Sequence, residues 1–188
     1  MDRFKEKLMD FNEKTINRQE IFKGNIIDVA LDEVELPNGK TAQRELVFHN
    51  GGVGLLALTA EQKIVLVKQF RKPLERTILE IPAGKIEQGE TDPEAVAVRE
   101  LEEETDYIAG SISPIADFIL SPGFCDERHY LFLATDLKKS ADPLPPDEDE
   151  FLEIIELTLA EAKQEIVRGT ICDAKTMYAI LYWESFMS

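Results

Sequence analysis

Residues 84–107 read GKIEQGETDPEAVAVRELEEETDY and are the most informative stretch of the chain. It opens with a glycine-containing loop and closes with the acidic run RELEEE at 99–104. Because an α-helix turns by about 100° per residue, Glu100, Glu103 and Glu104 project from one side of a helix. Carboxylates at such spacings repel one another, and a hard divalent cation bound through oxygen would relieve the repulsion. The helix is a candidate metal site; the alternative is a solvated acidic face.

The start of this helix is marked by residues that favour helix N-termini. Asp92 can accept hydrogen bonds from the first turn, and Pro93 suits the first helical position. The alternative is a capping box formed by Thr91 and Glu94. With either cap, we expect the helix to run to about Thr105.

Short β-rich segments occupy most of the remaining chain. Asn38-Gly39 separates two of them within residues 20–49, which predicts a hairpin. Residues 1–14 are predicted to be a short helix or a disordered lead-in. Further strands are predicted at 52–59, 63–70, 76–81, 111–120, 128–137 and 151–157, and further helices at 159–168 and 173–186. This order of elements predicts an α+β fold, an α/β/α sandwich around a mixed sheet.

The pattern changes at Gly51-Gly52, which divides the chain into two regions. We expect residues 1–50 to form a small N-terminal antiparallel β-sheet region. Residues 51–188 are expected to form the main domain, with the sandwich and the acidic helix.

Composition narrows the range of functions. The 188 residues include 37 acidic and 21 basic ones, for a net charge of −16. This charge argues against sequence-independent binding to nucleic acid or to an anionic membrane, although a polyanionic ligand can bind where metal ions neutralise the local field. No stretch reaches the roughly 18 apolar residues of a membrane span. Cys125 and Cys172 lie far apart, as expected for free thiols in the cytoplasm. Histidine occurs only twice, which disfavours zinc.

The stretch 84–107 resembles the Nudix box, whose pattern is G, five residues, E, seven residues, then R-E-U-x-E-E-x-G-U with U aliphatic. It departs from the pattern in its spacing, with eight residues between Glu90 and Arg99, and at the box glycine, where Asp106 stands. The extra residue falls before the carboxylates, so their mutual spacing is unchanged. Aspartate is one of the few residues that adopt the left-handed conformation of a helix end. The matching residues are Gly84, Glu90, Arg99, Glu100, Leu101, Glu103 and Glu104.

The flanking sequence is similar to the ADP-ribose pyrophosphatases of this superfamily, from about residue 21 to residue 183. The similarity rests on QFR at 69–71, LEIPAG at 79–84 and SPG at 121–123, with Pro122 about fifteen residues beyond the box. It implies hydrolysis of ADP-ribose to AMP and ribose 5-phosphate with Mg²⁺, or with Mn²⁺ in its place. The alternatives are a hydrolase of another nucleoside diphosphate sugar, such as GDP-mannose, and a non-catalytic ADP-ribose-sensing module.

The resemblance also implies roles for individual box residues. Glu100 and Glu104 would be the principal metal ligands, assisted by Glu103 and the carbonyl of Ala83. Arg99 would hold Glu103 or its neighbours in place; the alternative is a plain surface ion pair.

Substrate contacts are implied outside the box. Arg71 would grip the diphosphate or the adenine end, and Glu80 would contact adenine or ribose unless it simply pairs with Arg71. Phe22 would either stack on the base of the substrate or lie in the hydrophobic core, and a core position is the more common one for phenylalanine. Arg44 and Glu45 would also bind substrate: they would reach the neighbouring subunit's site in a homodimer that exchanges its N-terminal sheet. The last two implied substrate-binding residues are Gly123 and Glu127, in the loop after the predicted strand 111–120.

A second set of carboxylates lies in the acidic loop at 147–150. In the family, a glutamate on such a loop orients or deprotonates the attacking water. Glu150 matches best and Glu148 is second; the alternative is a solvated acidic loop.

Overall fold

The computed structural model describes residues 10–145 and 151–187 of the chain. Two units are distinguished: Met1–His49 with Ser121–Glu127, and Asn50–Leu120 with Arg128–Ser188. Residues 1–9, which belong to the predicted lead-in, lie outside the described residues.

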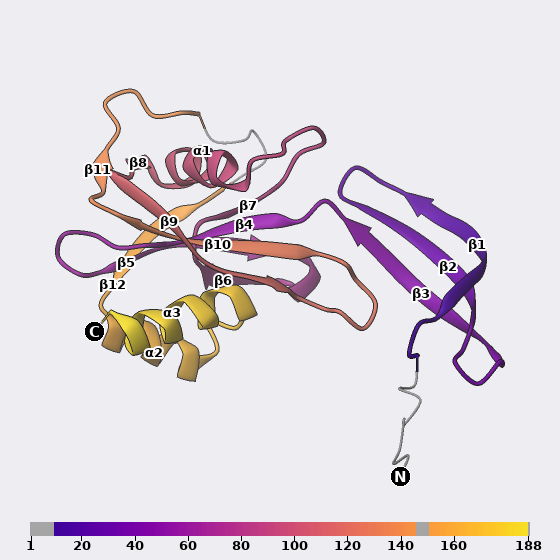
Figure 1. Ribbon diagram of the computed structural model, residues 1–188. Helices are drawn as coiled ribbons and strands as arrows, with labels where there is room; N and C mark the ends of the chain where they lie inside the picture. Colours follow the sequence, from indigo (N-terminus) through magenta and orange to yellow (C-terminus); the bar gives the residue numbers. More distant parts are fainter. Residues whose placement is uncertain (1–9, 146–150, 188) are drawn as a thin grey trace, which may run out of the picture. The chain divides into compact units, whose positions relative to one another are not determined.

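The first unit contains a three-stranded antiparallel sheet, with the order β1 (Lys14–Lys23), β2 (Ile27–Glu35) and β3 (Thr41–His49), drawn in indigo to purple in Figure 1. The predicted hairpin at Asn38-Gly39 is confirmed, and Gly39 has a φ of 78°, which glycine tolerates. β1 was not predicted from its start at Lys14. Every one of its residues is exposed, so the strand carries no pattern of buried apolar positions.

The second unit is built on two larger sheets and one short ribbon. One sheet has the order β7-β4-β10-β9, in which β4 and β10 are parallel and the other neighbours antiparallel. The other sheet is antiparallel, with the order β12-β5-β6, and β8 pairs with β11. The strands are β4 (Gly52–Ala57), β5 (Ile64–Arg71), β6 (Arg76–Glu80), β7 (Ala83–Lys85), β8 (Tyr107–Ile108), β9 (Ser111–Ile119), β10 (Arg128–Thr135), β11 (Lys138–Lys139) and β12 (Glu153–Leu157), with a 3₁₀ turn at Lys72–Leu74.

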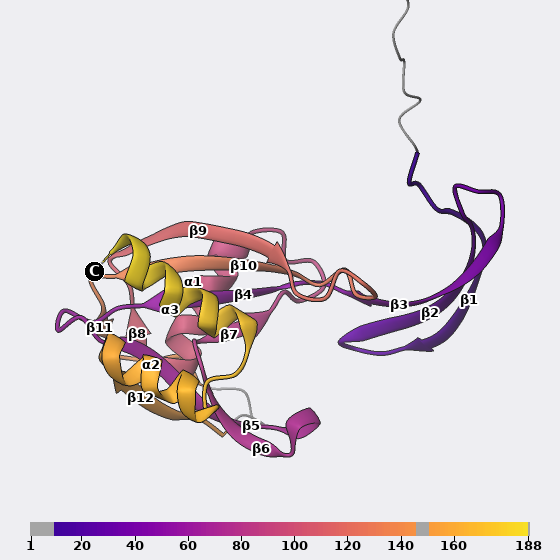
Figure 2. The same ribbon diagram turned by 90° about the horizontal axis from the view of Figure 1, so that it is seen from below.

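In the described part of this unit, three helices cover the sheets: α1 (Pro93–Thr105), α2 (Leu159–Arg168) and α3 (Ala174–Phe186). Figures 1 and 2 show α1 on one side of the strands and α2 and α3 on the other. The predicted α/β/α sandwich with a mixed sheet is therefore confirmed.

The core has one layer on each side of the sheets because neighbouring residues of a strand point to opposite faces. On β4, Leu55 packs in the cluster that includes Leu101 of α1, whereas Leu56 packs in the cluster that includes Ile180 of α3. All of β4 is buried, which explains its continuous apolar sequence.

Both ends of α1 have the expected caps. Asp92, not Thr91, caps the start and accepts hydrogen bonds from the backbone N–H groups of Glu94 and Ala95. Asp106 ends the helix with a φ of 57°, in the left-handed conformation that the box glycine would supply.

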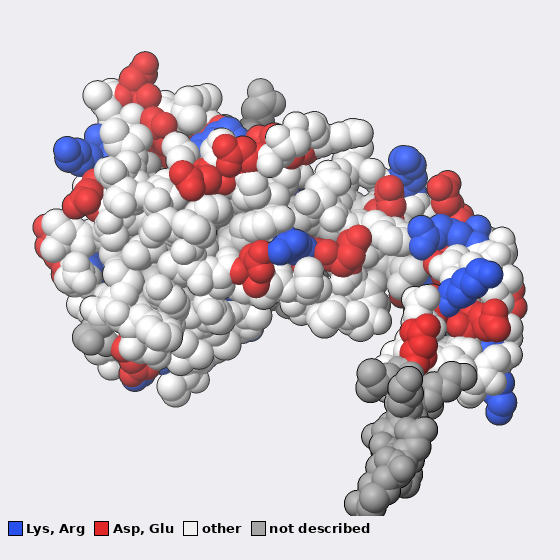
Figure 3. Space-filling model, in the orientation of Figure 1, with Lys and Arg blue, Asp and Glu red and all other residues white. Residues whose placement is uncertain are grey.

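No helix within the described ranges is long and apolar enough to cross a membrane. On the face shown in Figure 3, lysine and arginine side chains lie among acidic ones.

Candidate active site

The carboxylates of α1 meet the backbone at the start of β7. Glu100 and Glu104 are only 8% and 5% exposed, which is rare for glutamate unless its charge is compensated. The backbone N–H of Ala83 donates to Glu104 Oε2 at 2.9 Å. The turn after β6 and the acidic face of α1 therefore form one site.

Gly84 brings the backbone even closer to the helix. A Cβ atom built on Gly84 would lie 2.0 Å from Cδ of Glu100, a distance that no side chain could occupy without displacing the carboxylate. The glycine at this position is therefore needed for a close approach between the β7 backbone and Glu100, and its φ is not in the left-handed region.

Arg99 holds the acidic group together from its flank. Its guanidinium lies 2.6 Å from Glu103 Oε2, 2.9 Å from Glu100 Oε1 and 3.5 Å from Glu90 Oε1. Burial lowers the pKa of Arg99, but the charges of these three glutamates outweigh burial and the pKa is raised above its ordinary value. The contact with Glu90 is present despite the extra residue before Arg99.

A divalent cation fits the chemistry of this site. Within residues 10–145 and 151–187, no three or more His, Cys, Asp or Glu residues are grouped so as to hold a metal ion. The carboxylates of Glu100 and Glu104 nevertheless meet the backbone of Ala83 and Gly84 at one place. Such a place offers oxygen ligands only, which suits Mg²⁺ or Mn²⁺ and not zinc.

A second charged cluster lies at the end of β6. Glu80 is 3% exposed, and its two oxygens each face a cation: Oε2 lies 2.5 Å from Nε of Arg71, and Oε1 lies 2.5 Å from Nζ of Lys175. The pairing of Arg71 with Glu80, one of the two alternatives for Glu80, is therefore present.

Lys175 is a further charged residue of this cluster that the sequence did not predict. It lies in the first turn of α3, where a positive charge is unfavourable because of the helix dipole. This position in the sequence is itself informative, because a lysine in the first turn of a helix needs a nearby acidic partner.

The remaining predicted site residues are distributed over other parts of the chain. Arg44 of β3 binds Glu13, with Nη2 2.5 Å from Oε1, and Glu45 follows it on the strand. Gly123 and Glu127 lie in the segment Ser121–Glu127, which is linked to β3 by a 2.8 Å hydrogen bond from Val47 N to Phe124 O. Glu148 and Glu150 lie outside the described residues.

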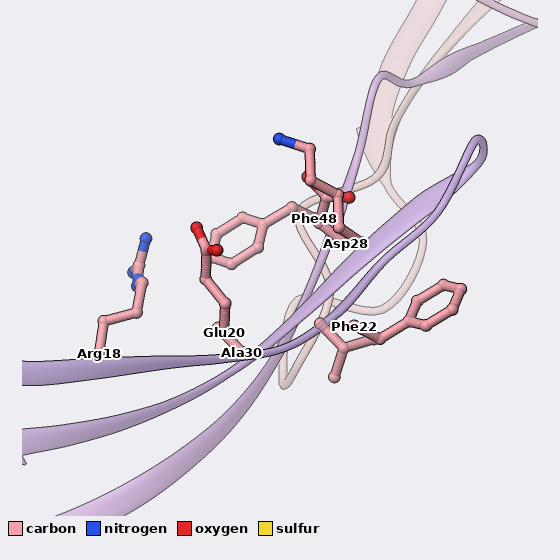
Figure 4. A pocket seen from close by; sticks show the side chains of 8 residues that line it. Arg18, Glu20, Phe22, Asp28, Ala30 and Phe48 are labelled. Atoms are coloured by element: carbon pink, nitrogen blue, oxygen red, sulfur yellow. The ribbon is translucent and has the colours of Figure 1, made fainter.

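The N-terminal sheet has a pocket of its own (Figure 4). Phe22 is 55% exposed at this pocket, so the expectation of a core phenylalanine is wrong. The guanidinium of Arg18 lies 4.8 Å from the centre of the Phe48 ring, a cation–π contact. The pocket is lined by Arg18, Glu20, Phe22, Lys23, Asp28, Val29, Ala30 and Phe48.

Comparison with known proteins identifies the family of this chain and agrees with its fold. The family profile described as NUDIX domain matches residues 48–177, and the chain belongs to the Nudix family. Residues 13–47 match the profile described as nucleoside diphosphate sugar hydrolase N-terminal domain.

Individual relatives resemble nearly the whole chain. The ADP-ribose pyrophosphatase of Bacillus subtilis (strain 168) is 52% identical over 93% of this chain and 94% of its own length. The methanol dehydrogenase activator of Bacillus methanolicus is 51% identical over 92% of each chain. The crystal structure of an ADP compounds hydrolase has a TM-score of 0.82 and 20% identity over 93% of this chain and 94% of its own, which supports the fold.

Proposed function

We propose that this protein is a divalent-metal-dependent hydrolase that cleaves the diphosphate of ADP-ribose to AMP and ribose 5-phosphate. The observation that carries the proposal is the meeting of two buried glutamates, Glu100 and Glu104, with the backbone of Ala83 and Gly84. The 52% identical relative named ADP-ribose pyrophosphatase supports this choice of substrate.

The reaction adds water across the phosphoric anhydride: the water oxygen bonds to one phosphorus, and the bridging P–O bond breaks. Mg²⁺, or Mn²⁺, held by Glu100 and Glu104 with the Ala83 carbonyl, would offset the charge of the diphosphate and lower the pKa of the water. Arg99 keeps Glu103 and Glu100 oriented, since its guanidinium contacts both.

The water must also lose a proton to a carboxylate. Glu103 is 21% exposed in its side chain and lies beside the candidate metal ligands. Glu150, with Glu148 as the second choice, remains the base predicted from the acidic loop. Single Glu→Gln variants at these three positions distinguish them, because loss of the base lowers kcat more than it changes KM.

Substrate contacts are proposed at Arg71 and Glu80. Arg71 donates to Glu80 through Nε alone, and its side chain is 38% exposed. Within the described residues its terminal nitrogens make no hydrogen bond, which leaves planar N–H donors for a diphosphate oxygen. Glu80 would accept from adenine or ribose. Gly123 and Glu127 complete the proposed substrate-binding set.

We further propose a homodimer formed through the N-terminal sheet, with Arg44 and Glu45 reaching the partner's site. β1 is an edge strand whose ten residues are all exposed, including Ile16 at 52% and Ile21 at 55%. Exposed apolar edge strands favour pairing with another chain. Light scattering coupled to size-exclusion chromatography tests the mass, and a monomer at micromolar concentration would contradict the proposal.

A cytoplasmic location is proposed from the two cysteines, which form no disulfide in the described chain.

The experiment that tests the activity is a substrate panel. ADP-ribose, other ADP-sugars, GDP-mannose and NADH are each incubated with Mg²⁺ or Mn²⁺, and the products are separated by chromatography. We expect ADP-ribose to have the highest kcat/KM and no turnover in EDTA. A preference for GDP-mannose would instead favour the alternative raised by the relatives named GDP-mannose pyrophosphatase, which are 31–33% identical. Tight ADP-ribose binding without any turnover would indicate a sensing module.

A further inference from the structure

The first turn of α3 is attached to the end of β6 by several polar contacts. The backbone N–H of Ile81 donates to Thr176 Oγ1 at 3.0 Å, a buried hydrogen bond. Asp173 caps the helix by accepting from Thr176 N at 3.0 Å, and its same oxygen accepts from Lys175 Nζ at 3.0 Å. This turn therefore holds the strand end that leads into the Ala83–Gly84 site.

Lys175 is the charged centre of this attachment. It is 9% exposed, and burial of an ammonium group is unfavourable without paired acids. Its position in the first turn of α3 adds an unfavourable interaction with the helix dipole. Two carboxylates compensate for both effects, Glu80 at 2.5 Å and Asp173 at 3.0 Å.

The geometry around Glu80 limits how Arg71 can bind. Lys175 takes Oε1 of Glu80, so Arg71 contacts Oε2 through Nε only. An arginine beside an unshared carboxylate tends to bind both oxygens with two nitrogens. Without Lys175, Arg71 could bind both oxygens of Glu80. Its terminal nitrogens, which belong to a partly exposed side chain, would then be engaged by Glu80.

We propose that Lys175 is a positioning residue for substrate binding: by occupying one oxygen of Glu80, it keeps the terminal nitrogens of Arg71 available to an anionic substrate. This inference rests on the proposed function, since the substrate is taken to be a nucleoside diphosphate sugar. Lys175 acts through Glu80 and Arg71 and contacts no reacting atom.

The test compares wild type with Lys175→Met, Glu80→Gln and the double variant. Lys163→Met is the matched control, because Lys163 also makes a 2.5 Å ion pair with a glutamate of α3, Glu184, but at the surface. Two quantities are measured for each protein: kcat and KM for ADP-ribose with Mg²⁺, and the Kd of ADP-ribose by calorimetry without added metal.

We expect Lys175→Met to raise KM and Kd about tenfold, equivalent to about 1.4 kcal/mol, with kcat within about threefold of wild type. In the Glu80→Gln background the same change should alter KM less than about twofold, because the carboxylate through which Lys175 acts is gone. Lys163→Met should behave as wild type.

The inference is overturned if Lys175→Met matches Lys163→Met in Kd, if it lowers kcat alone, or if its effect persists in full in the Glu80→Gln background. Should Lys175→Met fail to fold, the comparison of Glu80→Gln with the double variant remains, since the double variant removes both Lys175 and the charge of Glu80. Wild-type binding without turnover would overturn the proposed activity alone, and the Kd series would still decide the role of Lys175.

Discussion

Replacing Gly84 by alanine should lower the activity strongly while leaving the stability of the fold nearly unchanged. The new Cβ would lie 2.0 Å from Cδ of Glu100, and ordinary contact begins at 3.4 Å, so the carboxylate must retreat by about 1.4 Å. Metal–ligand distances tolerate only about 0.2 Å, and a misplacement of about 1 Å can cost about 100-fold in rate. We therefore expect kcat/KM for ADP-ribose to fall by about 100-fold.

The fold should survive this substitution. Gly84 does not have a positive φ, and the atoms nearest the new Cβ all belong to the end of one side chain. We expect the free energy of unfolding in urea to change by less than about 1 kcal/mol. Gly123→Ala is the matched control for folding, because a Cβ there meets nothing within 4 Å.

The assay combines ADP-ribose turnover with Mn²⁺ binding, measured from the electron paramagnetic resonance signal of the free ion. Wild-type turnover together with wild-type Mn²⁺ affinity in Gly84→Ala would refute the argument that Glu100 is a metal ligand pressed against β7.

Three further predictions concern the frame around the site. The hydrogen bond from Tyr107 to Glu156, and to a lesser extent burial, raises the Tyr107 pKa to about 12. The hydrogen bond therefore contributes fully to the stability of the fold below pH 10, and this contribution is lost between about pH 10 and 12. Ultraviolet titration should show the raised pKa and urea unfolding the loss of stability, and Tyr107→Phe should abolish this pH dependence. Asp92→Ala should lower the free energy of unfolding by about 1 kcal/mol through loss of the helix cap, whereas an unchanged urea midpoint would count against that cap. Asp106→Gly should raise the free energy of unfolding by about 0.5 kcal/mol. Glycine relieves roughly 1 kcal/mol of strain in the left-handed backbone of residue 106, and its greater flexibility in the unfolded chain offsets about half of that gain. A lower urea midpoint would contradict this expectation.

Local signals made much of the fold predictable. The caps of α1 and the hairpin at Asn38-Gly39 depend on residues close in sequence, and both are present. β1 was predicted only in its later part because an entirely exposed strand has no apolar alternation to reveal it.

The site was predictable to the extent that one helix carries it. The spacing of Glu100, Glu103 and Glu104 follows from helical geometry, as does the ion pair of Arg99 with Glu103. The contact between Lys175 and Glu80 joins residues 95 positions apart, and sequence spacing carries no information about it. The roles of Glu148 and Glu150 remain predictions.

The role proposed for Glu104 is to help bind the metal on which hydrolysis depends. Its most direct test is the rate of ADP-ribose hydrolysis with Mg²⁺ by wild type and Glu104→Gln, measured side by side. This role predicts equal amounts of AMP and ribose 5-phosphate from wild type, and a rate lower by about 100-fold or more in a Glu104→Gln protein with the wild-type melting temperature. A Glu104→Gln protein that hydrolyses ADP-ribose with Mg²⁺ as fast as wild type would contradict it.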